Sequence, residues 1–197
     1  MSNFRHHTLI PERERFRLRS TLFSGLIVCA TLISGLAIPN TSLQAQGTES
    51  ARKSQYVLNV SKFVTWPEHG DPQIDLCLLG NDPVHPDLES LEGKTVGGRK
   101  IQFTQYKNRR LVSQCEILFI GASEKRITRQ VLSELANAPV LTISDQPEFI
   151  QDGGIIELYR KGNRLAFDIG LEAANSAQLK ISSKLLRLAG NKPGSNQ

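Results

Sequence analysis

Histidine, cysteine and acidic residues are the side chains of this chain that could support catalysis, and their spacing restricts what they can do. A nucleophilic triad needs a histidine, and outside the first 45 residues the histidines are His69 and His85, both in proline-rich loops. Neither lies near a Gly-x-Ser-x-Gly turn. A zinc site needs three or four closely spaced ligands, which two loop histidines and two cysteines do not provide. The sequence therefore predicts neither a hydrolase nor a metal site.

Two glycine-containing turns follow apolar runs and could bind a ligand through their backbone amides. They are residues 80–83 (Gly-Asn-Asp-Pro) and 121–123 (Gly-Ala-Ser). Doubly wound folds bind ligands at such positions, on the amides at helix starts. The spacing is not Gly-x-Gly-x-x-Gly, and no lysine and hydroxyl pair completes a phosphate loop. We interpret the segments as strand-to-helix turns, and we expect no cofactor.

The first 45 residues are typical of an export signal. An arginine-rich stretch precedes a nearly charge-free run from Leu22 to Ile38, and Ala45 is a small residue at the exit of this segment. We therefore predict a signal peptide over residues 1–45, cleaved after Ala45 to leave a periplasmic protein with no direct membrane insertion. The alternative is an uncleaved anchor, although the run of about seventeen residues is shorter than the roughly twenty that a spanning helix needs.

Cys77 and Cys115 are the two cysteines that remain once the predicted signal peptide is removed. An even pair in an exported protein is typical of a disulfide. The alternative is two buried free thiols, which behave as small apolar residues. If the strands that carry these cysteines are neighbours, as doubly wound sheets favour, their Cα atoms could lie within the roughly 4.4–6.8 Å that a disulfide requires.

The charge of the chain lies largely in its first 45 residues. The whole sequence has a formal net charge of +5, but no lysine and arginine stripe with interleaved aromatic residues is present in residues 46–197. We therefore exclude nucleic acid as a partner. The composition, with 39% hydrophobic and 22% charged residues, is that of an ordinary globular protein.

Apolar spacing predicts alternating helices and strands. Helical spacing begins at Gln55, and Pro67 prevents that helix from continuing. Strands are expected over residues 74–79, 100–106, 115–120, 139–143, 155–159 and 165–169. Helices are expected over 87–91, 123–136 and 174–188, the last one ended by Gly190. The turn residues 161–163 predict that the last two strands form an antiparallel hairpin.

These elements predict one α/β domain over residues 55–190. We expect a single mixed, mostly parallel sheet of about six strands, with helices on both faces and a C-terminal hairpin plus a long helix. Residues 46–54 are polar and unpatterned, so we expect a flexible N-terminus there, and a disordered tail over residues 191–197. Without a visible reaction centre, binding becomes the expected role.

Several strings of this sequence resemble the YfiR family of periplasmic proteins, and their order and spacing fit over about residues 55–190. The strings are Phe63–Pro67, Leu76–Gly80, Leu91–Arg99, Cys115–Ser123, Val140–Asp145, Gly153–Ile155 and Lys180–Leu188. The family-signature positions within them are Phe63, Trp66, Pro67, Gly80, Gly97, Gly98, Gly121, Ser144, Asp145, Gly153 and Gly154.

The resemblance implies a regulator that is not an enzyme. It would bind the periplasmic sensor domain of an inner-membrane diguanylate cyclase, inhibit the cyclase, lower cyclic di-GMP and so regulate biofilm formation. The resemblance also implies a homodimer and maps a cysteine pair of the family's best-known member, in its first and third strands, onto Cys77 and Cys115. A second cysteine pair of that member is absent here, which argues against redox switching. The alternative function is a periplasmic small-molecule binding module with a ligand at the Gly80 and Gly121 turns.

Overall fold

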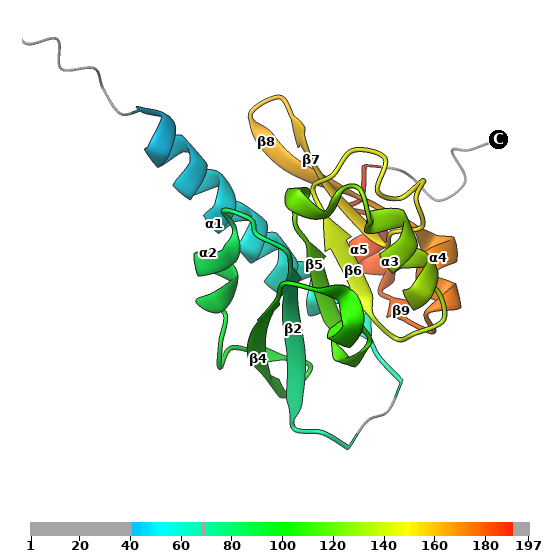
Figure 1. Ribbon diagram of the computed structural model, residues 1–197. Helices are drawn as coiled ribbons and strands as arrows, with labels where there is room; N and C mark the ends of the chain where they lie inside the picture. Colours follow the sequence, from blue (N-terminus) through cyan, green and yellow to red (C-terminus); the bar gives the residue numbers. More distant parts are fainter. Residues whose placement is uncertain (1–40, 68–69, 191–197) are drawn as a thin grey trace, which may run out of the picture. The chain divides into compact units, whose positions relative to one another are not determined.

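A seven-stranded sheet forms the centre of the protein in this computed structural model, which describes residues 41–67 and 70–190 (Figure 1). The parallel strands β4, β2, β5, β6 and β7 lie between β3 and β8, which are antiparallel to their neighbours at the two edges. In spatial order the strands are β3 (Thr95–Val96), β4 (Arg99–Tyr106), β2 (Gln73–Leu79), β5 (Ile117–Ile120), β6 (Leu141–Ser144), β7 (Ile156–Lys161) and β8 (Arg164–Ile169). The mixed, mostly parallel sheet is confirmed, with seven strands where about six were expected.

The strand order is that of a doubly wound sheet of the flavodoxin type. Taken in chain order, the first parallel strand, β2, lies between the second, β4, and the third, β5. Leu76 of β2 is opposite Ile117 of β5, which confirms that these two strands are neighbours. The strand β5 and residues 76–79 of β2 are continuous apolar runs because both of their faces are buried.

Helices cover both faces of the sheet, as predicted. One core contains buried residues of α1 (Thr41–Ser61), α2 (His85–Glu89), α4 (Leu171–Ser176) and α5 (Ser183–Leu186). The core on the other face contains residues of α3 (Thr128–Leu135) and of the 3₁₀ helix η1 (Arg109–Gln114). A second 3₁₀ turn, η2 (Ala122–Glu124), precedes α3, so the helix predicted from residue 123 begins at Thr128.

The N-terminal helix α1 is longer than predicted. Residues 46–54, expected to be a flexible terminus, are part of α1, and the expectation is therefore wrong for this structure. Ser50 and Ser54 are buried, and the Ser54 hydroxyl donates a hydrogen bond to the Ala51 carbonyl within the helix. Small hydroxyl residues can thus occupy a buried helix face, but they leave no apolar periodicity in the sequence. The predicted signal peptide up to residue 40 and the predicted tail over 191–197 lie outside the described residues.

The long C-terminal helix predicted over residues 174–188 is wrong. The helix α4 ends at Ser176, and Gln178 adopts a left-handed φ of 59°. Leu179 donates its N–H to the Ala174 carbonyl, which closes the helix end. The chain then forms β9 (Lys180–Ile181), which pairs antiparallel with β1 (Val64–Thr65), before α5 begins. The apolar spacing of this segment therefore reflects burial of two short helices and a strand.

The edge strand β8 is covered on its open side. The Tyr56 hydroxyl of α1 donates to the Leu165 carbonyl at 2.7 Å, and the Gly190 N–H donates to the Phe167 carbonyl at 2.9 Å. Backbone groups that would otherwise be unpaired at the sheet edge are thus bonded within the chain. The predicted hairpin is confirmed, because β7 and β8 pair antiparallel around the Gly162–Asn163 turn.

The predicted disulfide joins Cys77 of β2 to Cys115, two residues before β5. The two Cα atoms are 6.0 Å apart, and both residues are buried in the core beneath η1 and α3. The bridge therefore fastens the two central strands to each other. The alternative of two free thiols is not what the structure contains.

Breaking the disulfide should lower the free energy of unfolding by about 4 kcal/mol, because a loop spanning a sequence separation of 38 residues is no longer closed in the unfolded chain. The measurement is urea unfolding with and without dithiothreitol. The Cys77→Ala, Cys115→Ala variant is the matched control, since its unfolding should not respond to the reductant. Identical unfolding of oxidised and reduced wild-type protein would contradict the prediction.

Replacing Gln178 by glycine should leave the stability unchanged or raise it by up to about 1 kcal/mol, because glycine adopts a positive φ without a Cβ clash. The same exchange at Gln130, inside α3, should lower the stability by up to about 1 kcal/mol. The urea concentrations at the unfolding midpoints of both variants test whether stability is kept or raised at position 178 and lowered at position 130. A loss at position 178 equal to that at position 130 would show a continuous helix.

Candidate functional site

The turns after β2 and β5 meet at the carboxyl end of the sheet, where doubly wound proteins bind ligands. The Ala122 N–H donates to Oδ2 of Asp82 at 3.2 Å, and the Asn81 N–H donates to Oγ of Ser123 at 3.0 Å. Oδ1 of Asp82 accepts the N–H of Val84 at 2.9 Å. Side chains of the protein therefore bind the amides that a ligand would use.

This close approach needs a glycine at position 80 and leaves little room for a side chain at position 121. Gly80 has a φ of +90°, and a Cβ there would lie 2.5 Å from Oγ of Ser123. At Gly121 a Cβ would lie 3.1 Å from Cβ of Asp82. The carbonyls of the two glycines accept hydrogen bonds from the side-chain amides of Gln105 and Gln146. The two predicted turns are thus brought together, but their contacts form a packed edge.

Ser144 and Asp145, at the end of β6, tie the same edge to α1. The Ser144 hydroxyl donates to the Ile120 carbonyl at 2.7 Å, and Oδ2 of Asp145 accepts from Nζ of Lys53 at 2.6 Å. Glu49 bridges Lys53 at 3.3 Å and Arg160 of β7 at 2.6 Å. An ionic network therefore holds the first half of α1 against β6 and β7.

Electrostatics in this network favour the charged forms. Burial pulls the pKa of Lys53 down, but the hydrogen bond and charge of Asp145, with Glu49, outweigh it, so the pKa lies above its ordinary value. Burial raises the pKa of Glu49, but Arg160 and Lys53 outweigh that effect and lower it. Within the described residues, Oδ1 of Asp145 is buried without a hydrogen-bond partner.

The aromatic signature positions, Phe63 and Trp66, lie near the amino end of the parallel strands, opposite the Gly80 and Gly121 turns. Nε1 of Trp66 donates to the Glu116 carbonyl at 3.1 Å, and the Phe63 carbonyl accepts the N–H of Ser182 at 2.9 Å. Pro67 follows Trp66 and is half-buried. The aromatic side chains of Phe63 and Trp66 pack against the core. These residues fix the chain between α1 and β2, and their contacts are structural.

The carboxylate of Glu116 joins β2 and Arg99 at the same end of the strands. Oε2 of Glu116 accepts the N–H of Asp75 at 2.7 Å, and Oε1 of Glu116 pairs with Arg99. Burial, followed by the charge of Glu116, raises the pKa of Asp75. Gly97 and Gly98, with φ values of +57° and +85°, form the turn between β3 and β4 that places Arg99 here.

Gly153 and Gly154 serve packing between β6 and β7. Gly153 has a φ of +100°. A Cβ at Gly154 would lie 2.2 Å from the ring of Phe149, which is fully buried. The signature positions therefore lie at both ends of the parallel strands and in the connection between β6 and β7. They do not converge on one site.

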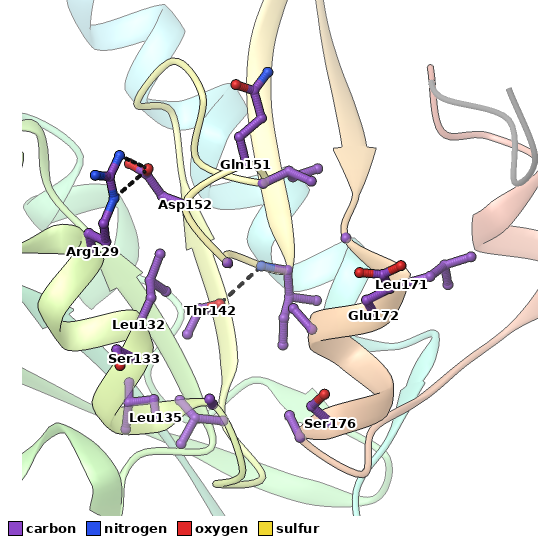
Figure 2. A pocket seen from close by; sticks show the side chains of 18 of the residues that line it. Arg129, Leu132, Ser133, Leu135, Thr142, Gln151, Asp152, Leu171, Glu172 and Ser176 are labelled. Atoms are coloured by element: carbon purple, nitrogen blue, oxygen red, sulfur yellow. Dashed lines mark hydrogen bonds and ion pairs between the residues drawn. The ribbon is translucent and has the colours of Figure 1, made fainter. Parts of the chain in front are cut away.

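A groove of about 670 Å³ between α3 and α4 is a candidate binding site that sequence reasoning missed (Figure 2). Its apolar wall includes Leu132 and Leu135 of α3, and α4 contributes Glu172 and Ser176 on the opposite side. The residues come from three separate segments, 129–142, 150–155 and 169–177, and many are ordinary core types. The sequence pattern therefore held no signal for the groove.

One rim of the groove carries an ion pair. Nε and Nη2 of Arg129 both donate to Oδ1 of Asp152, at 3.0 and 2.6 Å (Figure 2). Inside the groove, Oγ1 of Thr142 accepts the N–H of Ile155 at 3.1 Å. The two charged groups of this rim are thus paired with each other, and the Thr142 hydroxyl oxygen is bonded to the backbone.

The described ranges, 41–67 and 70–190, contain no group of three or more histidine, cysteine, aspartate or glutamate residues placed to hold a metal ion. Within the same ranges, no helix has the length and apolar character needed to cross a membrane.

The fold is similar to that of a solved structure described as a conserved domain protein from Vibrio cholerae O1 biovar El Tor str. N16961. The TM-score is 0.53 at 9% sequence identity, and the match covers 73% of this chain. It covers 60% of that chain, so this protein spans about three fifths of the length of the Vibrio cholerae protein. At this identity the similarity shows the fold alone.

A protein-family match covers residues 50–190. The matched range begins in the buried part of α1 and ends at Gly190, whose N–H covers the edge of β8. It contains every signature position and both cysteines of the disulfide. The chain belongs to the YfiR/HmsC-like family, a family of periplasmic regulators in diguanylate cyclase pathways.

Proposed function

We propose that this protein binds the periplasmic sensor domain of an inner-membrane diguanylate cyclase and holds the cyclase inactive, which lowers cyclic di-GMP. The observation that carries the proposal is membership of the YfiR/HmsC-like family over residues 50–190. In this proposal the protein itself is not an enzyme, and it acts in the periplasm after export.

The geometry of the sheet supports a binding role. The edge where a doubly wound fold would bind a substrate is filled by Asp82, Ser123 and the two glutamines, and its amides are bonded within the protein. The surface of the fold, by contrast, offers a groove between α3 and α4 that is lined by both apolar and polar side chains. A site built in this way can contact a partner without transforming it.

A small-molecule binding module is the second candidate function. The Gly80 and Gly121 turns give it little support, because their neighbouring amides are already bonded. The groove favours it more, since its volume of about 670 Å³ lies in the range of ligand pockets. A thermal-shift screen with nucleotides, amino acids and anions tests this candidate, and a flat response would remove it.

Deleting the gene in its host should raise cyclic di-GMP and biofilm formation, because the cyclase would lose its inhibitor. The wild-type gene should restore both, whereas a gene lacking residues 1–45 should not, since its product would stay in the cytoplasm. Cyclic di-GMP is measured by mass spectrometry of cell extracts. An unchanged level after deletion contradicts the proposed function, and full rescue by the shortened gene contradicts action in the periplasm.

Direct contact is tested separately from the cellular effect. The tagged, exported protein is crosslinked in its host and purified, and the attached inner-membrane proteins are identified. Enrichment of a diguanylate cyclase over an unrelated exported protein supports direct inhibition. Loss of cyclic di-GMP control without any enriched cyclase would place the protein elsewhere in the pathway. The homodimer that the family resemblance implies stays a prediction.

A further inference from the structure

The β7–β8 hairpin extends beyond the rest of the sheet. The strand β6 pairs with β7 only at Ile156 and Glu157, so residues 158–161 of β7 and their partners in β8 continue without a neighbour on that side. The first half of α1 projects at the same end of the sheet (Figure 1). The 2.6 Å contact between Glu49 and Arg160 joins the helix to the hairpin.

This end of the protein is rich in cations. Its exposed cationic side chains, named here the basic tip, are Arg52, Arg160, Lys161 and Arg164. Glu49 binds Arg160 and Lys53, but the ion pairs of the described residues include no partner for the other three members of the tip. The ion pairs of the described residues therefore offset Arg160 alone among the members of the basic tip.

Two of these cations face each other across the hairpin. Lys161 and Arg164 are directly opposite in the register, on either side of the Gly162–Asn163 turn. Like charges opposite each other on paired strands destabilise a sheet. Gly162 has a φ of +61°, which suits a tight two-residue turn with glycine first. The turn thus presents two uncompensated cations at a fixed spacing, which indicates an anionic binding partner.

We propose that the basic tip docks on the anionic phospholipid headgroups of a bilayer surface. Phosphate groups would neutralise Lys161 and Arg164 together and remove the repulsion between them. The contact is peripheral, because the tip ends in Gly162 and Asn163 and carries no exposed large apolar side chain. Clustered lysine and arginine residues attract anionic membranes with roughly 1 kcal/mol each.

A nucleic acid fits this surface less well. Single-stranded nucleic acid is bound by aromatic side chains on which the bases stack, and residues 160–164 contain none. An acidic protein surface is the other possible partner, and the experiment below distinguishes it from a lipid surface. The proposal does not depend on the regulation of a cyclase.

Vesicle sedimentation with the protein purified from its host in exported form tests the proposal. The protein should bind vesicles of phosphatidylethanolamine with phosphatidylglycerol, and it should not bind vesicles of phosphatidylcholine alone. The Lys161→Gln, Arg164→Gln variant should bind about 30-fold more weakly, from the loss of two such charges. Added salt should weaken binding of the wild type, because it screens exposed charges.

The matched control removes two exposed lysines at the opposite edge of the sheet, as Lys94→Gln, Lys100→Gln, and should bind as the wild type does. The hairpin variant should unfold at the same temperature as the wild type or a higher one, since a repulsion has been removed. Equal weakening by the two variants would mean a diffuse charge effect and would overturn the proposal. No wild-type binding to anionic vesicles would also overturn it, and crosslinks from Lys161 to an acidic protein would then identify the partner class.

Discussion

Burial of both faces of β5 and of residues 76–79 of β2 is the constraint on which the rest of the structure depends. These two adjacent apolar segments need cover on each side, and the chain provides it with α1, α2, α4 and α5 on one side and η1 with α3 on the other. The disulfide between Cys77 and Cys115 lies on the second side, where part of the cover is the 3₁₀ helix η1. A covalent bond thus supports the pair on the side with fewer covering elements.

The same constraint shapes the carboxyl edge. Because β2 and β5 are adjacent, the turns that leave them are crowded together, which favours glycine at positions 80 and 121. In the crowded turns, the backbone amides at the switch point of the sheet donate to the side chains of Ser123 and Asp82. In a fold often used for ligand binding, the candidate recognition surfaces thereby lie elsewhere, on the groove between α3 and α4 and on the projecting end formed by α1 and the hairpin.

The central sheet could be predicted from the sequence because its signals are local. Apolar runs closed by Gly80 and Gly121 identify buried strands, and Gly162 identifies a hairpin. The C-terminal segment was predicted wrongly because its apolar spacing fits a helix, whereas pairing of β9 with β1 depends on residues more than a hundred positions apart. The first half of α1 was missed because Ser50 and Ser54 are buried without being apolar.

For the candidate sites as well, local signals could be predicted and contacts between distant residues could not. The disulfide could be predicted, because the sequence itself shows both an export signal and two cysteines outside it. The packing roles of Gly154 and Trp66 could not, because each depends on a neighbour that only the folded chain provides. The basic tip was also missed, because its cations come from α1 and from both strands of the hairpin. A search for a continuous basic stripe does not detect such a cluster.

The bonds on the outer side of β8 determine where the folded unit can be cut. Tyr56 near the start of the domain and Gly190 at its end each satisfy a carbonyl of the same strand. Truncation before Gly190, or loss of the Tyr56 hydroxyl, would leave an acceptor on a long edge strand that another extended chain could bond. With both ends of the domain in place, these two carbonyls are bonded within the chain and do not offer acceptors to a second chain.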